Sequence, residues 1–177
     1  MPARFISPML LLPKDKLPEG PNWLYELKLD GYRAIAIKGR GKVLLRSRND
    51  KDFSTRYPDI AGALAAMPDE TVIDGEVVAL DTDGKPSFNL LQNYGVGGAQ
   101  LVYYVFDVLV LAGKDVMREP LDTRRALLEE HVLPRLNEPI RFSQEFRASL
   151  ADLVEAVKAQ GFEGLVAKNR TKRYEPA

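Results

Sequence analysis

The stretch WLYELKLDGYRAIAIKGRGKVLLRS, residues 23–47, decides the fold, because apolar runs alternate in it with short polar breaks. The pattern predicts strands over Leu24–Leu29, Arg33–Lys38 and Lys42–Arg46. The breaks Asp30-Gly31 and Gly39-Arg40-Gly41 are typical of tight turns. Connections this short predict that each strand pairs with the next one in antiparallel fashion.

The rest of the chain adds more strands than helices. Apolar runs predict strands over Thr71–Leu80, Leu101–Leu111 and Phe162–Asn169. Helices are predicted after Pro58, after a capping Ser87, over Leu121–His131, and from a capping-box pattern at Ser149 and Asp152 to Gly161. Because strands outnumber crossover helices, we expect an α+β fold with two mainly antiparallel β-sheets, flanking helices and a cleft between the sheets.

Composition excludes several classes of function. The chain of 177 residues has no cysteine, which rules out a disulfide, a thiol nucleophile and a thiolate zinc site. The longest apolar stretch, Leu101–Ala112, is too short to span a bilayer, and the N-terminus lacks a signal-peptide pattern. We therefore expect a cytoplasmic monomer without membrane contact. With 25 basic and 25 acidic side chains, any nucleic-acid contact must be local or come from elsewhere in a longer protein.

The first candidate site residue is Lys28, inside the segment Glu26–Arg33. A lysine at the end of an apolar strand has a fixed direction, and partial burial near other cations would lower its pKa and make it a nucleophile. Arg33 lies close enough in sequence to contact a phosphate. The alternative is a strand whose Lys28 reaches solvent beside an ordinary Asp-Gly turn.

Carboxylates inside three other apolar segments form the second group of candidates. Asp74-Gly75-Glu76 interrupts one strand, Asp107 lies in another, and Glu163 and Lys168 bracket a third. An acid within an apolar strand must be paired, protonated or bound to a metal ion. For each segment alone, carboxylates that face water remain the alternative.

The order of these segments resembles the covalent nucleotidyltransferases: the ATP-dependent DNA ligases, RNA ligases and mRNA capping enzymes. The matching motifs are Lys28-Leu29-Asp30-Gly31, Ser47-Arg48-Asn49, Asp74-Gly75-Glu76, Tyr104–Asp107 and Glu163–Lys168. Details such as Ser7-Pro8-Met9-Leu10 and Arg48–Asp52 resemble DNA ligases, most of all the ligase domain of bacterial end-joining repair ligases. The resemblance implies an adenylation domain with an ATP-grasp-like fold and a nucleotide in its cleft.

For the phosphates, the resemblance implies that Lys28 attacks the α-phosphate of ATP, releases pyrophosphate and holds AMP through a phosphoramidate. Arg33 and Arg48 would bind the ribose and phosphate region and later the 5′-phosphate of a DNA nick. Lys168 would reach a phosphate.

For the base, ribose and metal, the resemblance implies that Glu26 contacts the adenine amino group and that Phe106 stacks on adenine. Glu76 would hold the ribose hydroxyl and help to position Mg²⁺ or Mn²⁺, and Glu163 would serve the same metal ion. Cations suit the reaction because charge on the transferred phosphoryl group must be neutralised.

The chain departs from the family pattern after Lys168. The family continues to a Lys-x-Lys strand and an oligonucleotide-binding-fold domain, whereas here the sequence runs only to Tyr174-Glu175-Pro176-Ala177. We therefore expect residues 1–177 to be an adenylation domain that is truncated before its last strand. Alone, this fragment would be impaired as an enzyme. Within its full-length parent it would join DNA nicks or ends. An RNA ligase, a capping nucleotidyltransferase and a nucleotide-binding module without catalysis remain the alternatives.

Overall fold

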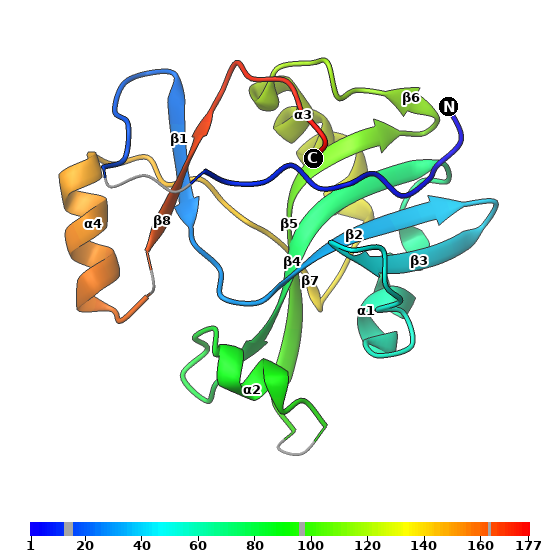
Figure 1. Cartoon of the computed structure of the whole chain (residues 1–177), viewed down its shortest axis with the longest axis horizontal. Coiled ribbons are helices and arrows are strands. Elements are labelled where there is room, and N and C mark those ends of the chain that lie inside the picture. Colours follow the sequence, from blue (N-terminus) through cyan, green and yellow to red (C-terminus); the bar gives the residue numbers. More distant parts are fainter. Residues whose placement is uncertain (13–15, 96–97, 163) are drawn as a thin grey trace.

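The computed structural model describes residues 1–12, 16–95, 98–162 and 164–177. Its larger sheet has six strands in the order β3-β2-β4-β5-β6, with β7 beside β5 (Figure 1). These strands are β2 (Tyr32–Gly39), β3 (Lys42–Ser47), β4 (Thr71–Leu80), β5 (Gln100–Leu111), β6 (Lys114–Asp115) and β7 (Ile140–Phe142). Among the described pairs only β5–β7 is parallel.

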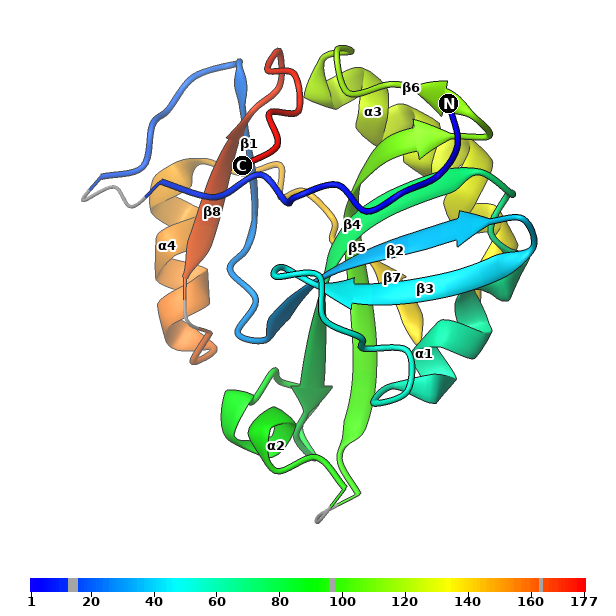
Figure 2. The ribbon, with the colours of Figure 1, turned by 45° about the vertical axis from the view of Figure 1, so that its right-hand side comes forward.

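A second, smaller sheet consists of β1 (Trp23–Leu27) and β8 (Leu165–Asn169), which pair in antiparallel fashion. It stands beside the larger sheet and carries α4 (Leu150–Ala159) on its outer side (Figures 1 and 2). The predicted α+β class with two mainly antiparallel sheets is therefore confirmed.

The predicted pairing of the first two strands was wrong, because β1 pairs with β8 and β2 pairs with β3 and β4. The Asp-Gly segment is a crossing between the sheets, and Leu29 packs against Val78 and Leu80 of the larger sheet. Gly31 lies so close to β4 that a Cβ atom there would overlap the carbonyl oxygen of Val77. Glycine is required here for a close approach of two backbones rather than for a hairpin.

The helices are short and lie on the outside. They are α1 (Pro58–Ala63), α2 (Phe88–Gln92) and α3 (Leu121–Leu127), the last continuing as a π-helical segment over Leu128–Val132, with single 3₁₀ turns at Leu64–Ala66 and Leu133–Arg135. The predicted caps are confirmed, because Ser87 accepts a hydrogen bond from Leu90 N and Ser149 accepts one from Asp152 N. No helix within the described ranges is long and apolar enough to cross a membrane.

The two faces of the larger sheet have different roles. On β5, Tyr103 and Val105 point into the main core, which also contains Tyr57 and Ile60. The ring of Phe106 is turned away from this core, towards Arg33 and Lys168 on the opposite face. That second face is therefore the one that carries candidate site residues.

A bulge in β5 lies opposite the Asp74–Gly75 step of β4. The β4–β5 register shifts between Asp74 and Gly75, and a Cβ atom on Gly75 would overlap the Tyr104 carbonyl oxygen and crowd the Tyr103 ring. The extra residue is Phe106, which the β4–β5 register skips, and glycine at position 75 allows the close approach of the two strands.

Candidate functional site

A cluster of charged side chains surrounds the ring of Phe106, where the smaller sheet meets the larger one. Lys168 Nζ lies 3.9 Å from the ring centroid, and Arg33 Cζ lies 5.0 Å from it. The same Lys168 ammonium forms an ion pair with Glu26 Oε2 at 2.9 Å. Four predicted site residues from β1, β2, β5 and β8 are thereby brought together.

Glu26 is held by two residues that the sequence analysis missed. Its side chain is only 2% exposed. Ser143 Oγ donates to Oε1 at 2.6 Å, and Arg125 Nη1 donates to Oε2 at 3.0 Å. The guanidinium of Arg125 also donates to the main-chain carbonyls of Phe106 and Ser143. Besides Lys168, Glu26 therefore has a second cationic partner, Arg125, and a hydroxyl donor, Ser143.

The signal for Arg125 was present in the sequence of α3. Leu121, Arg124, Arg125 and Leu128 follow the spacing i, i+3, i+4, i+7 that marks the buried face of a helix. All four are buried, so two adjacent arginines occupy core positions and need buried partners.

Arg124 is the buried ion-pair partner of Asp107, the acid in the apolar strand β5. It binds Asp107 through two hydrogen bonds of 2.8 and 3.0 Å, and both side chains are buried. Burial raises the pKa of the Asp107 carboxyl, while the hydrogen bonds from Arg124 oppose that rise. Asp107 is thus the paired acid that an apolar strand requires.

Asp74 serves a similar role for Arg33. The Arg33 guanidinium binds Asp74 through contacts of 2.7 and 2.6 Å and donates to the carbonyl of Met9 at 2.8 Å. Tyr174 Oη also donates to Asp74, at 2.6 Å. Burial alone would lower the pKa of Arg33, but Asp74 outweighs burial and the pKa is raised. Arg33 therefore stays charged, opposite Glu76 in the β2–β4 register.

At Glu76, burial outweighs the effect of the neighbouring cations on the carboxyl pKa. Burial raises its pKa to about 7, although Arg33 and Lys168 oppose the shift. A partly buried carboxylate of this kind is an incompletely compensated anion, which suits an adjacent divalent cation. Within the described ranges no group of three or more His, Asp or Glu residues could hold a metal ion. The other predicted metal ligand, Glu163, lies outside the described residues.

The raised pKa of Glu76 predicts that Glu76→Gln stabilises the fold at neutral and higher pH. Between the usual pKa of 4.5 and the folded value of about 7, only the unfolded chain loses the proton, so ionised Glu76 opposes folding increasingly up to pH 7. Since one pKa unit corresponds to about 1.4 kcal/mol, we expect a gain of about 3 kcal/mol at pH 8 and less than about 1 kcal/mol at pH 5.

Urea unfolding of both proteins at the two pH values measures this effect. The exposed Glu155→Gln on α4 is the matched control and should change stability by less than about 0.5 kcal/mol. Equal effects of Glu76→Gln at pH 5 and pH 8 would show that the proton on Glu76 is not involved.

Lys28 and Arg48 are exposed and lie at the margins of this cluster. Lys28 follows β1 directly, and its main-chain N–H donates to the Gly164 carbonyl at 2.9 Å. The partial burial expected for Lys28 was therefore wrong, because the strand ends one residue before it. Arg48 is the first residue after β3, whose last residue Ser47 pairs with Ala34.

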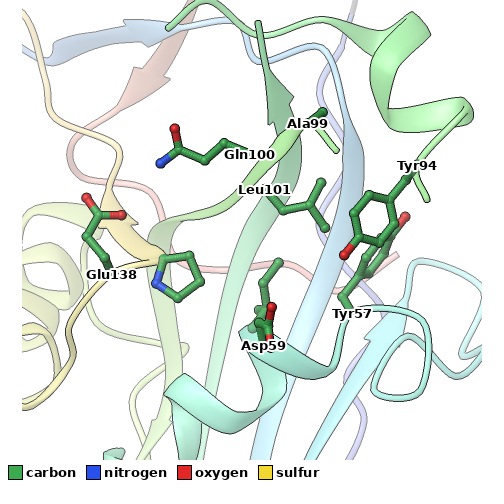
Figure 3. A pocket seen from close by; sticks show the side chains of 9 residues that line it. Tyr57, Asp59, Tyr94, Ala99, Gln100, Leu101 and Glu138 are labelled. Atoms are coloured by element: carbon green, nitrogen blue, oxygen red, sulfur yellow. The ribbon is translucent and has the colours of Figure 1, made fainter. Parts of the chain in front are cut away.

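A hollow lies on the opposite face of the larger sheet (Figure 3). Its volume is about 480 Å³, and its lining includes Tyr57, Tyr94 and Leu101. The charged residues that line it are Asp59 and Glu138. Because both are acidic, this hollow does not suit a ligand with phosphate groups. The cluster around Phe106 is therefore the better candidate site.

Comparison with known proteins gives one consistent family. A family model described as the ATP dependent DNA ligase domain matches residues 9–177. The multifunctional non-homologous end joining protein LigD of Pseudomonas aeruginosa is 36% identical over 173 residues, which is 96% of this chain and 20% of that protein. LigD of Mycobacterium tuberculosis is 35% identical over 161 residues, 87% of this chain and 20% of the relative. The chain thus spans about a fifth of the length of these relatives.

Two solved structures are similar over most of the chain. Mycobacterial DNA ligase D complexed with ATP and MES has a TM-score of 0.78 and 31% identity, covering 97% of this chain and 56% of that one. The ligase domain of M. tuberculosis LigD has a TM-score of 0.75 and 33% identity, covering 88% of this chain and 51% of that one.

Proposed function

Because this chain belongs to the ATP-dependent DNA ligase family and is an adenylation domain of that family, we propose that Lys28 takes up AMP from ATP. Neutral Lys28 Nζ attacks the α-phosphorus, the new N–P bond forms, the bond to pyrophosphate breaks, and the amine gives up a proton. The observation that supports this most is the cluster of Phe106, Glu26 and Lys168 beside the strand that leads to Lys28.

The adenine subsite in this proposal is the face of Phe106 with Glu26 at its edge. A planar aromatic ring offers a stacking surface to a purine, and an ionised carboxylate accepts a hydrogen bond from the 6-amino group. Glu26 is buried and already held in one orientation, which suits a group that reads the edge of a base. Glu76 would hold the ribose hydroxyl.

The phosphate subsite would be formed by Arg33 in β2 and Arg48 directly after β3. Glu76 and Glu163 would hold a divalent cation, Mg²⁺ or Mn²⁺, which would neutralise charge on the phosphoryl group during transfer. The under-compensated carboxylate of Glu76 supports this placement. Arg33 stays charged through Asp74 and presents its cation next to that carboxylate.

Lys168 would change partners when the nucleotide binds. Its ammonium is 3.9 Å from the Phe106 centroid, the distance at which a stacked base would lie. Adenine must therefore displace it from both Phe106 and Glu26. The displaced ammonium would then turn to the phosphates.

This exchange predicts opposite effects of Lys168→Ala on two ligands. Adenosine has no phosphate, so removing the competing ammonium is expected to tighten its binding about 3- to 10-fold. With ATP the variant loses a phosphate contact, and AMP uptake should slow by about 10-fold or more.

Calorimetry with adenosine and single-turnover labelling with ATP measure the two effects. The exposed Lys172→Ala is the control and should leave both unchanged. Weaker adenosine binding by Lys168→Ala would contradict the exchange, because it would make Lys168 part of the base site.

We further propose that AMP passes from Lys28 to the 5′-phosphate of DNA at a nick or an end, in a protein of the end-joining repair type. The similarity to LigD proteins supports this proposal. Since the chain has no net charge and duplex affinity rests largely on neutralised phosphates, DNA contact would depend on local cations such as Arg48.

The proposed function is tested by incubation with ATP or GTP, each radiolabelled at the α-phosphate, plus Mg²⁺. We expect label from ATP that survives denaturation of the protein. Label from GTP alone would instead indicate a capping nucleotidyltransferase. Nucleotide binding without covalent label would indicate a binding module without catalysis.

A further inference from the structure

We propose that Arg125 is a positioning residue that makes the site selective for adenine over 6-oxopurines. It would do so by holding Glu26 and Phe106 in a fixed mutual arrangement without touching the nucleotide. The inference rests on the proposed roles of Glu26 and Phe106.

One guanidinium joins three separate parts of the fold. Arg125 from α3 donates through Nη1 to Glu26 Oε2 in β1 at 3.0 Å and to the Phe106 carbonyl in β5 at 3.2 Å. Through Nη2 it donates to the Ser143 carbonyl, just after β7, at 2.9 Å. Its plane also lies over the Phe142 ring, 4.5 Å from the centroid. A rigid, planar fork fixes the distances between its acceptors in a way that a flexible lysine does not.

The guanidinium of Arg125 is needed because Glu26 would lose its contact with Lys168 when a base binds. Both carboxylate oxygens are engaged, Oε1 by Ser143 and Oε2 by Arg125 and Lys168. When adenine displaces Lys168, Arg125 is the remaining cation among these partners. A buried carboxylate needs such a cation, and an ionised carboxylate only accepts hydrogen bonds. The Glu26 carboxylate would therefore accept a hydrogen bond from a 6-amino group and repel a 6-oxo group.

Arg124 provides a matched comparison within the same helix. It is adjacent, equally buried and also bound to a carboxylate, but that carboxylate is Asp107. Its other hydrogen bonds go to the carbonyls of Glu119 and Lys172. A substitution at Arg124 therefore disturbs the same helix and the same kind of buried ion pair without removing a hydrogen bond from Glu26.

The test measures the dissociation constants of ATP and inosine triphosphate by calorimetry, because binding does not require the covalent step. In the unchanged protein ATP should bind at least about 10-fold more tightly, as expected for a hydrogen bond to a charged group. Arg125→Met should reduce this ratio to less than about 3-fold, and Arg125→Lys should give an intermediate value. Arg124→Lys should keep the original ratio.

Ser143→Ala is a second, milder variant that keeps the proposal testable if Arg125→Met does not fold. It removes the donor to Glu26 Oε1 and should also lower the ratio. Unchanged ratios in Arg125→Lys and Ser143→Ala, or an equal fall in Arg124→Lys, would overturn the positioning role. Failure of the unchanged protein to discriminate, or discrimination that persists in Glu26→Gln, would instead contradict the proposed base contact of Glu26.

Discussion

Lys28→Ala is expected to abolish covalent uptake of AMP and to leave the fold intact. The substitution removes the only nitrogen that the proposed reaction uses as a nucleophile, so the rate should fall to background. Lys28 is exposed and follows the last residue of β1, and such surface substitutions usually change stability by less than about 0.5 kcal/mol. The measurement is denaturing gel analysis after incubation with α-labelled ATP and Mg²⁺, together with urea unfolding.

The exposed Lys114→Ala in β6 is the matched control and should label like the unchanged protein. Retained labelling of Lys28→Ala would identify another residue as the nucleophile. Unfolding of the variant would show that Lys28 supports the structure instead.

The largest loss of stability is expected from Arg124→Met. The substitution leaves the buried carboxylate of Asp107 without its cation and removes the donor to two main-chain carbonyls. Breaking a buried ion pair from one side costs about 3–5 kcal/mol. Urea unfolding at pH 7 measures this loss, and the exposed Arg118→Met should lie within about 0.5 kcal/mol of the unchanged protein.

The double variant Asp107→Asn, Arg124→Met separates charge from packing. Because it leaves no unpaired buried charge, it should unfold less readily than Arg124→Met alone. A double variant that is less stable than Arg124→Met would show that the pair contributes through shape rather than through charge.

Strand periodicity predicted most of the fold because its signal is local. The strands over residues 71–80 and 100–111 have nearly the predicted limits. The partner of β1 was missed because Asp30-Gly31 has the composition of a hairpin turn, whereas the structure uses that glycine for contact with β4. Nothing in the sequence near β1 specifies β8, which lies at the other end of the chain.

The candidate site was predicted in its parts but not in its connections. Glu26, Phe106 and Lys168 were chosen by motif, and the structure brings them into contact. Arg125 was overlooked because the helical pattern was used only to place apolar residues. A cation at a core-facing helical position requires a buried anion, and for Arg125 that anion is Glu26, one of the predicted site residues.

The pairing of β1 with β8 has a consequence for how the molecule assembles. These strands lie roughly 140 residues apart in sequence, so their ladder closes one of the longest loops in the chain and should form late in folding. Lys28, Glu26 and Lys168 are all on or beside that ladder. A nascent chain therefore acquires the surroundings of Lys28, the proposed nucleophile, only after residue 169 has been synthesised. By the same logic, amide hydrogens of β1 and β8 should exchange faster than those of the β4–β5 pair, because local opening of the small sheet does not require the larger one to unfold.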